Sequence, residues 1–324
     1  MPRTVRTHMP LRTRVFAAIL QRLPSMAVHK MSVEDLPQAR AWVPPSTGPL
    51  ARISGKVPAH IGISETTYPT RDGHARLVRV YRPASVGPHP VVVYFHGGGW
   101  VLGHPRQYDS LCAFLADEVD AVVLSFDYRK GPEYAAPTAA HDAVDAVRWA
   151  AQWAGHFGGD PERLGVAGDS AGGGLATVAC HVIRDEGGPT IRHQALIYPG
   201  VDMTMASPSI QENSEGPVLT AEMMRVFTGH YMASAQVGHD HPLVSPLMHE
   251  DLAGLPSALV QTAEFDPVRD EGLAYARRLA EAGVAVRVTN YAGVPHGFMS
   301  FPGATLVGQQ ARFELAHEIR RHLA

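Results

Sequence analysis

The sequence of 324 residues predicts one α/β domain with a helical cap. Three observations indicate this fold class. Strand and helix signals alternate from about residue 90 to about residue 320 without a linker, which favours a mostly parallel sheet of about eight strands with helices on both faces. Two glycine-rich motifs each follow a short apolar strand directly. Hydrophobic residues make up 45% and charged residues 18% of the chain, as in globular proteins with one large core.

Residues 1–48 are predicted to form N-terminal cap helices that cover the functional site. The large apolar residues of this segment share one helical face: Val15, Phe16, Ile19, Leu20 and Leu23. A targeting segment is the alternative, because basic residues precede the first acid at Glu34. The apolar run is short and no small-residue cleavage site follows it, so the cap helix is favoured.

The sheet is predicted to begin with an antiparallel hairpin at its edge. Its strands are Ile61–Tyr68 and Ala75–Tyr81, joined around Arg71-Asp72-Gly73. The parallel strands follow: Val91–Phe95, Ala121–Phe126, Leu164–Ala167, Gln194–Tyr198, Ala258–Ala263 and Val284–Tyr291. Helices are expected between and after them, notably Thr138–Ala154, Ala171–Arg184, Asp270–Ala282 and Ala304–His322. The core then comprises residues 49–200 and 241–324.

Residues 201–240 are predicted to be a second part of the cap. No strand signal appears between Pro199 and Gly254, where six methionines gather: Met203, Met205, Met223, Met224, Met232 and Met248. Flexible thioethers suit an adaptable apolar wall, and they equally suit the inner packing of a lid. His239-Asp240-His241 lacks a third ligand at suitable spacing, so no metal site is predicted.

The segment Gly168-Asp169-Ser170-Ala171-Gly172 lies between a predicted strand and a predicted helix. A serine on such a sharp turn has a strained backbone and an exposed hydroxyl, and its neighbours two residues away must be glycine. Asp160-Pro161-Glu162-Arg163 is interpreted as the turn that leads into the strand. Ser170 is therefore the candidate nucleophile.

The second motif, His96-Gly97-Gly98-Gly99-Trp100, directly follows the strand Val91–Phe95. Consecutive glycines let backbone N–H groups turn toward one point, as stabilisation of an oxyanion requires. The glycine spacing does not fit a dinucleotide-binding loop, and the motif lacks the lysine of a phosphate-binding P-loop.

Together the two motifs resemble the bacterial hormone-sensitive-lipase-like esterases of the α/β-hydrolase superfamily. Further segments extend the likeness over roughly residues 60 to 300. Tyr128-Arg129-Lys130-Gly131-Pro132-Glu133 is similar to the family's YRLAPE segment and departs from it at Lys130 and Gly131. The segment from Glu264 to Gly272 and the terminal His296-Gly297-Phe298 are similar to the two segments that carry the family's acid and base.

The resemblance implies an α/β-hydrolase fold with Ser170 as nucleophile, Asp266 as acid and His296 as base. It also implies an oxyanion hole formed by Gly98, Gly99 and the N–H of Ala171. The residues themselves lead to the same triad, because Asp266 and His296 each follow a predicted parallel strand, at the sheet edge that binds ligands. Glu264 is the rival acid, whereas Asp270 is expected to open a helix and His96 to brace the oxyanion loop.

The predicted activity is hydrolysis of short-chain carboxylic esters through an acyl-enzyme, without cofactor or metal. Trp100 and Phe298 are expected to bind substrate by narrowing the cleft. An amidase, a lactonase or an acyltransferase could use the same triad, so these remain alternatives. A non-catalytic ligand-binding module is disfavoured because Ser170, Asp266 and His296 are all present.

The expected partner is a small-molecule ester, and a homodimer is compatible with the sequence. A net charge of −3 gives no reason to expect nucleic-acid binding. No run approaches the about 18 apolar residues of a membrane span, so no integral membrane association is expected. The two cysteines, Cys112 and Cys180, fall on predicted helices as buried thiols, which is compatible with the cytoplasm.

Overall fold

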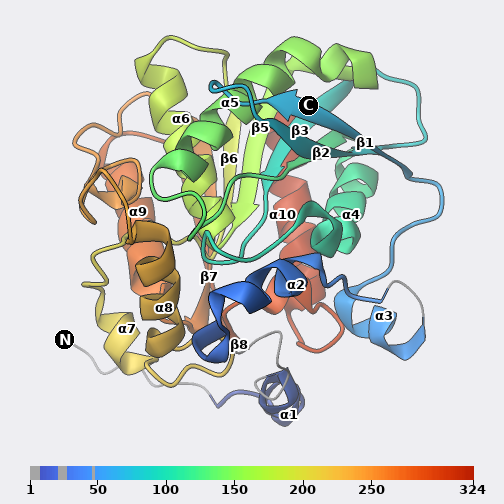
Figure 1. Cartoon of the computed structure of the whole chain (residues 1–324). Coiled ribbons are helices and arrows are strands. Elements are labelled where there is room, and N and C mark those ends of the chain that lie inside the picture. The colour runs from blue at the N-terminus through green and yellow to red at the C-terminus, as the bar shows by residue number, and fades with distance from the viewer. Residues whose placement is uncertain (1–7, 21–27, 46–47) are drawn as a thin grey trace.

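A computed structural model of the chain describes residues 8–20, 28–45 and 48–324. It contains one eight-stranded sheet in the order β1-β2-β4-β3-β5-β6-β7-β8 (Figure 1). The strands are β1 Gly62–Pro69, β2 Ala75–Arg82, β3 His89–Phe95, β4 Val122–Phe126, β5 Gly159–Asp169, β6 His193–Ile197, β7 Ser257–Phe265 and β8 Val286–Pro295. The predicted number of strands and their order along the chain are confirmed.

The first two strands form the antiparallel edge of the sheet, as the hairpin signal predicted. β1 pairs with β2 and β2 with β4 in antiparallel register, and all other neighbours are parallel. The expected turn at 160–163 is wrong: these residues belong to β5, where they form an irregularity opposite the step from His89 to Val91. Their turn chemistry persists, since the Glu162 N–H donates to the Asp160 carboxylate at 3.0 Å.

Helices cover both faces of the sheet, because alternate strand residues point to opposite sides. Val91, Val93 and Phe95 of β3 pack into one apolar core, and Val92 and Tyr94 pack into the other. The helices on the first face are α5 Thr138–Trp153, α6 Ala171–Asp185 and α9 Arg269–Glu281. Those on the second are α4 Asp109–Val119 and α10 Gly308–Leu323. The terminal helix therefore begins later than its predicted start at Ala304.

The remaining helices gather at one end of the molecule, below the sheet in Figure 1. They are α1 Leu11–Leu20, α2 Leu36–Ala41, α3 Gly48–Ser54, α7 Pro208–Glu212 and α8 Ala221–Met232. No helix in the described part of the chain is long and apolar enough to cross a membrane.

The apolar face predicted for the first helix is confirmed for Leu20 but wrong for Val15 and Ile19. Val15 and Ile19 are each 52% exposed, while Thr13, Ala17 and Leu20 are buried. The Phe16 ring packs against Phe301, with ring centroids 5.0 Å apart. Leu23 lies outside the described residues, as do residues 1–7, 21–27 and 46–47 of the predicted cap and its boundary.

Candidate active site

Ser170 lies in the turn between β5 and α6 with φ 55° and ψ −123°. Positive φ is rare for a residue with a β-carbon, and such strain persists only where the surroundings enforce it. Here the glycines two positions away on either side of Ser170 let neighbouring backbone segments pack closely around the turn. A β-carbon on Gly172 would overlap the carbonyl oxygen of Phe95, and one on Gly168 would overlap the backbone of Gly172. The Ser170 N–H donates to the Ile197 carbonyl at 2.9 Å, which holds the turn above β6.

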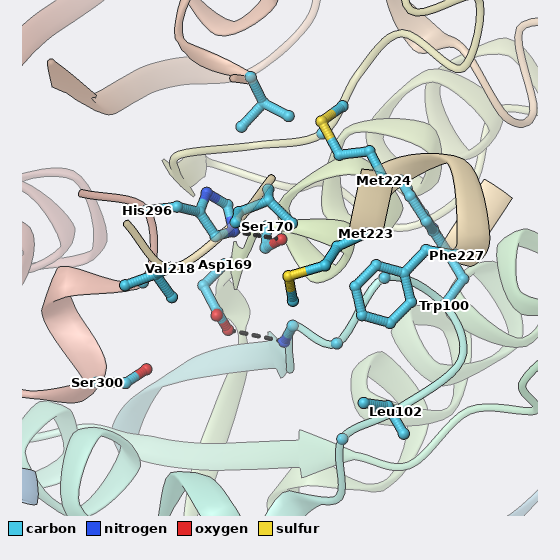
Figure 2. A pocket seen from close by; sticks show the side chains of 18 of the residues that line it. Trp100, Leu102, Asp169, Ser170, Val218, Met223, Met224, Phe227, His296 and Ser300 are labelled. Atoms are coloured by element: carbon cyan, nitrogen blue, oxygen red, sulfur yellow. Dashed lines mark hydrogen bonds between the residues drawn. The ribbon is translucent and has the colours of Figure 1, made fainter. Parts of the chain in front are cut away.

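The serine hydroxyl is the end of a chain of hydrogen bonds through His296 to Asp266. Ser170 Oγ lies 2.9 Å from His296 Nε2, and His296 Nδ1 lies 2.7 Å from Asp266 Oδ2. Because a carboxylate accepts at Nδ1, the proton there leaves Nε2 free to accept from the serine. Figure 2 shows the His296 ring turned toward Ser170. The structure thus brings together three side chains that follow β5, β7 and β8.

Asp266 is fully buried, and its second oxygen accepts from the Val268 N–H at 3.0 Å. The rival carboxylates have other partners. Glu264 accepts from the Gly293 N–H at 2.8 Å. Asp270 lies in the first turn of α9, as expected, and pairs with Arg269 at 2.8 Å. Asp266 is therefore the carboxylate that orients the imidazole of His296.

The His96–Trp100 loop runs beside the serine at the end of β3. Gly98 has φ +128°, Gly99 has φ +61° and Trp100 has φ +59°, so the chain makes a tight turn here. The N–H groups of Val101 and Leu102 both donate to the Gly98 carbonyl, at 3.1 and 2.7 Å. Gly98 and Gly99 line the same pocket as Ser170, and Ala171 is the first residue of α6.

His96 braces this loop, as the sequence predicted. Its ring is fully buried and its Nδ1–H donates to the Gly97 carbonyl at 2.8 Å. Burial lowers the pKa of His96 to about 4, so the imidazole is neutral at physiological pH. The ring also stacks on Tyr128, with centroids 4.4 Å apart.

Asp169, which the sequence analysis did not single out, connects the serine turn to the glycine loop. Its Oδ1 accepts from the Gly97 N–H at 2.9 Å and from the Tyr94 hydroxyl at 2.8 Å, and its Oδ2 accepts from the Tyr108 hydroxyl at 3.2 Å. The bond to the loop is visible in Figure 2. Burial raises the pKa of Asp169 to about 6, against the opposing effect of these hydrogen bonds. In sequence, this residue occupies only a variable position of the motif, so nothing marked it out.

The pocket around Ser170 has a volume of about 250 Å³. Figure 2 shows Trp100, Met223 and Phe227 on one side of the serine and Val218 and His296 on the other. Of the methionines noted in the sequence, four line the pocket: Met203, Met205, Met223 and Met224. Met223 also packs into an apolar cluster with Leu36 and Val101. The methionines of this segment thus form part of the apolar pocket wall and also pack inside the cap.

Of the two expected substrate-binding aromatics, only Trp100 lines this pocket. Its indole stacks on Tyr231 of α8, with centroids 5.7 Å apart and ring planes 8° apart. Phe298 differs from the expectation, because it is 1% exposed and packs against Tyr198 and Tyr291. The aromatic residue from that neighbourhood that lines the pocket is Phe301, beside Gly297 and Ser300.

Within the described ranges, no three His, Cys, Asp or Glu side chains are grouped to hold a metal ion. The carbonyl of His239 accepts from the Ser245 hydroxyl at 2.5 Å, and His241 Nδ1 accepts from the Leu243 N–H at 3.2 Å. Both histidines therefore support a turn. Cys112 and Cys180 are buried free thiols.

Comparison with known proteins gives consistent findings. A family model described as the alpha/beta hydrolase fold matches residues 92–300. The chain is 39% identical to the carboxylic ester hydrolase LipN of Mycobacterium tuberculosis over 273 residues, which are 82% of this chain and 72% of that protein. It is 37% identical to an ethyl acetate hydrolase of Pseudomonas putida over 279 residues, 84% of this chain and 87% of that one.

Solved esterase structures superpose over nearly the whole chain. A thermostable esterase from Pseudomonas putida matches with a TM-score of 0.88 and 35% identity, over 99% of both chains. A hyperthermophilic esterase from the archaeon Pyrobaculum calidifontis matches with a TM-score of 0.85 and 37% identity, over 98% of this chain and 100% of that one.

Proposed function

We propose that Ser170, His296 and Asp266 are the catalytic triad of this chain, which belongs to the hormone-sensitive-lipase-like family of α/β hydrolases. The chain is a serine carboxylic ester hydrolase. The observation that carries this assignment is the hydrogen-bonded chain from Ser170 Oγ through both ring nitrogens of His296 to Asp266. Nucleophile and base are within the reach that proton transfer requires.

In the first half of the reaction, Ser170 Oγ attacks the ester carbonyl carbon and His296 Nε2 takes the hydroxyl proton. The carbonyl π electrons move to the oxygen, which becomes an oxyanion. When the tetrahedral intermediate collapses, the bond to the alkoxy group breaks and the same proton passes from Nε2 to the leaving alcohol. A water molecule then attacks the acyl carbonyl carbon while His296 Nε2 takes its proton. When this second tetrahedral intermediate collapses, the bond to Ser170 Oγ breaks, the proton passes from Nε2 to Oγ, and the acid is released.

Asp266 keeps the imidazole in the tautomer that this sequence needs and stabilises the imidazolium that forms. Its full burial strengthens that interaction, since no solvent screens the pair. The N–H groups of Gly98, Gly99 and Ala171 would donate to the oxyanion. A donor of this kind contributes on the order of 10²- to 10³-fold in turnover.

We propose that the substrates carry short acyl chains. The pocket volume of about 250 Å³ is at or below the lower end of ligand pockets, which usually span about 300 to 1,000 Å³. Trp100 and Phe227 bound it with rigid aromatic rings. The name of the ethyl acetate hydrolase relative, which refers to a two-carbon acyl ester, supports the same substrate class.

A fluorophosphonate probe tests the nucleophile directly, because only an activated serine reacts with it. Mass spectrometry should find the adduct on Ser170, and Ser170→Ala should not be labelled. A parallel panel of matched aryl esters, anilides and lactones separates an esterase from an amidase or a lactonase, and product analysis with added alcohol detects acyl transfer. Labelling at another residue would contradict the triad. Faster turnover of the anilide or the lactone than of the matched aryl ester would show that the enzyme is an amidase or a lactonase.

We also propose that residues 1–48 and 201–240 form the cap and residues 49–200 and 241–324 the catalytic core. The support is that α2, α7 and α8 lie at the pocket end of the sheet. A cytoplasmic location, with its reducing conditions, is proposed because both cysteines are free and buried. The proposal includes a homodimer and no nucleic-acid binding. Fractionation of cells that carry a tagged full-length chain tests the location. Light scattering tests the homodimer, and a DNA-binding assay tests the absence of nucleic-acid binding.

A further inference from the structure

The short helix α2 covers the pocket. Its Leu36 is fully buried in an apolar cluster that includes Val101 and Phe227. Ala39 and Trp42, from the end of this helix and just after it, line the pocket. Gln107 also holds this segment, since its amide donates to the carbonyls of Arg40 at 3.2 Å and Trp42 at 2.7 Å. The segment is thus a wall of the pocket as well as part of the N-terminal region.

Arg40 joins this helix to two other segments of the chain. Its Nε donates to the Val101 carbonyl at 2.7 Å, and its Nη2 donates to the Gly131 carbonyl at 2.7 Å. The same guanidinium makes a two-pronged ion pair with Glu133, with both N–O distances at 2.8 Å. Four hydrogen bonds from one side chain therefore connect α2, the glycine loop and the segment from Gly131 to Glu133.

Arg40 contacts the chain next to the proposed oxyanion hole both directly, at Val101, and through Gly131. Gly131 donates its N–H to the Trp100 carbonyl at 2.9 Å, while its own carbonyl accepts from Arg40. The Val101 carbonyl, two residues after Gly99, accepts from Arg40 directly. Trp100 has φ +59°, a conformation that needs support from its surroundings. Arg40 thus supports the backbone that directly follows Gly98 and Gly99 at two points, the Val101 carbonyl and, through Gly131, the Trp100 carbonyl.

We propose that Arg40 is a positioning residue for ester hydrolysis, which couples the seating of α2 over the pocket to the geometry of the oxyanion hole. This inference rests on the proposed role of Gly98 and Gly99. A residue that only packed the wall would affect substrate binding. A residue that aims the N–H groups affects the transition state, because the oxyanion is fully formed only there.

Lysine cannot replace arginine here. Its ammonium is one point of charge, whereas the planar guanidinium reaches two carbonyls and a carboxylate at once. Arg40→Lys keeps the charge and should make only part of this set of bonds. Arg40→Met keeps much of the side-chain volume and removes every donor.

Arg71 offers a matched control. It donates to both oxygens of Asp145, at 2.9 and 3.2 Å, and to the His141 carbonyl at 3.4 Å, so it has the same kinds of partner. Arg71 lies in the turn between β1 and β2. In the part of the chain that the structure describes, Arg71, Asp145 and His141 all lie outside the pocket lining. Arg71→Met should leave kcat within about twofold of wild type, because neither Arg71 nor these partners line the pocket.

The experiment measures kcat and KM for p-nitrophenyl acetate, the pH profile, and the inhibition constants of a trifluoromethyl ketone and its parent methyl ketone. The fluorinated ketone forms an oxyanion with an active serine, and the parent serves as the ground-state analogue. For Arg40→Met we expect kcat to fall by about tenfold or more, and the affinity for the fluorinated ketone to fall in parallel. The affinity for the methyl ketone and the pH profile should stay as in wild type, and Arg40→Lys should be intermediate.

A folded Arg40→Met enzyme with wild-type kcat and wild-type affinity for the fluorinated ketone would overturn the inference, as would a rise in KM alone. If Arg40→Met does not fold, Arg40→Lys decides the question by the same readouts. Failure of the proposed triad is a separate result, because the wild-type enzyme would then fail to bind the fluorinated ketone through Ser170.

Discussion

Replacement of Asp169 by asparagine should change how the stability of the protein depends on pH. The amide oxygen introduced by Asp169→Asn can still accept from the Gly97 N–H, as the carboxylate does, and the amide carries no charge at any pH. The wild-type carboxyl has an ordinary pKa of 3.8 and a folded-state pKa of about 6, raised by burial. Between these values the folded protein binds more protons than the unfolded chain.

The sign follows from linkage. The stability supplied by a proton on Asp169 is present at low pH and is lost as the pH rises toward the folded-state pKa of about 6. Integration from pH 8 down to pH 5 gives a gain of about 1.4 kcal/mol for the wild-type protein relative to Asp169→Asn. Titrating groups that do not interact with Asp169 are shared by the two proteins and cancel in the difference.

Denaturant unfolding of both proteins at pH 5, 6, 7 and 8 measures this difference, provided that the denaturant slopes agree. Carboxyl NMR offers a direct check, because one aspartate resonance should titrate near pH 6 and be missing from Asp169→Asn. Stability curves that stay parallel over this range, together with no such resonance, would refute the reasoning from burial.

The remaining predictions concern the triad and the pocket. Ser170→Ala should fold normally and retain only the about 10³- to 10⁴-fold acceleration over water that binding and the oxyanion hole provide, as measured by p-nitrophenyl ester hydrolysis and circular dichroism. A folded Ser170→Ala enzyme with near-normal activity would exclude this residue as the nucleophile. Asp266→Asn should lower kcat by about 10⁴-fold, because it supports the wrong histidine tautomer, and Glu264→Gln should cost far less. The reverse ranking would move the acid to Glu264. Across p-nitrophenyl esters of increasing acyl length, kcat/KM should be highest at about four to eight carbons, because further methylenes find no apolar surface to bury. A maximum at about twelve carbons or more, or activation at an oil–water interface, would indicate a lipase instead.

The sequence predicted the sheet and the site because both depend on local patterns. Ser170 occupies a strand-to-helix turn whose glycines are visible in the sequence. Asp266 and His296 each follow a predicted strand, and parallel strands bring such ends to one edge. Strand ends differ from the prediction by a few residues, and the largest difference is in β5, where turn-forming residues lie inside a strand.

The N-terminal region was harder to predict, because its packing depends on long-range contacts. The predicted apolar face was right for Leu20, which is buried, but Val15 and Ile19 of the same face are exposed, and Ala17 packs inward in their place. Phe298 was expected at the cleft because it follows His296, but its ring is buried against Tyr198, which also contacts the His296 ring. Arg40 carried no motif at all, since its partners lie 61 to 93 residues away in the sequence.

The catalytic residues and much of the pocket wall come from different parts of the fold, so sequence changes can affect one without the other. Adjacent β3 and β5 carry the glycine loop and the serine, and adjacent β7 and β8 carry the aspartate and the histidine. Much of the pocket wall comes from segments outside the sheet, among them α2, α8 and the stretch around Met203 and Met205. Libraries of variants with substitutions confined to those outer segments can therefore alter substrate specificity while the catalytic residues stay unchanged. Arg40 is the exception, since a change there alters both properties at once.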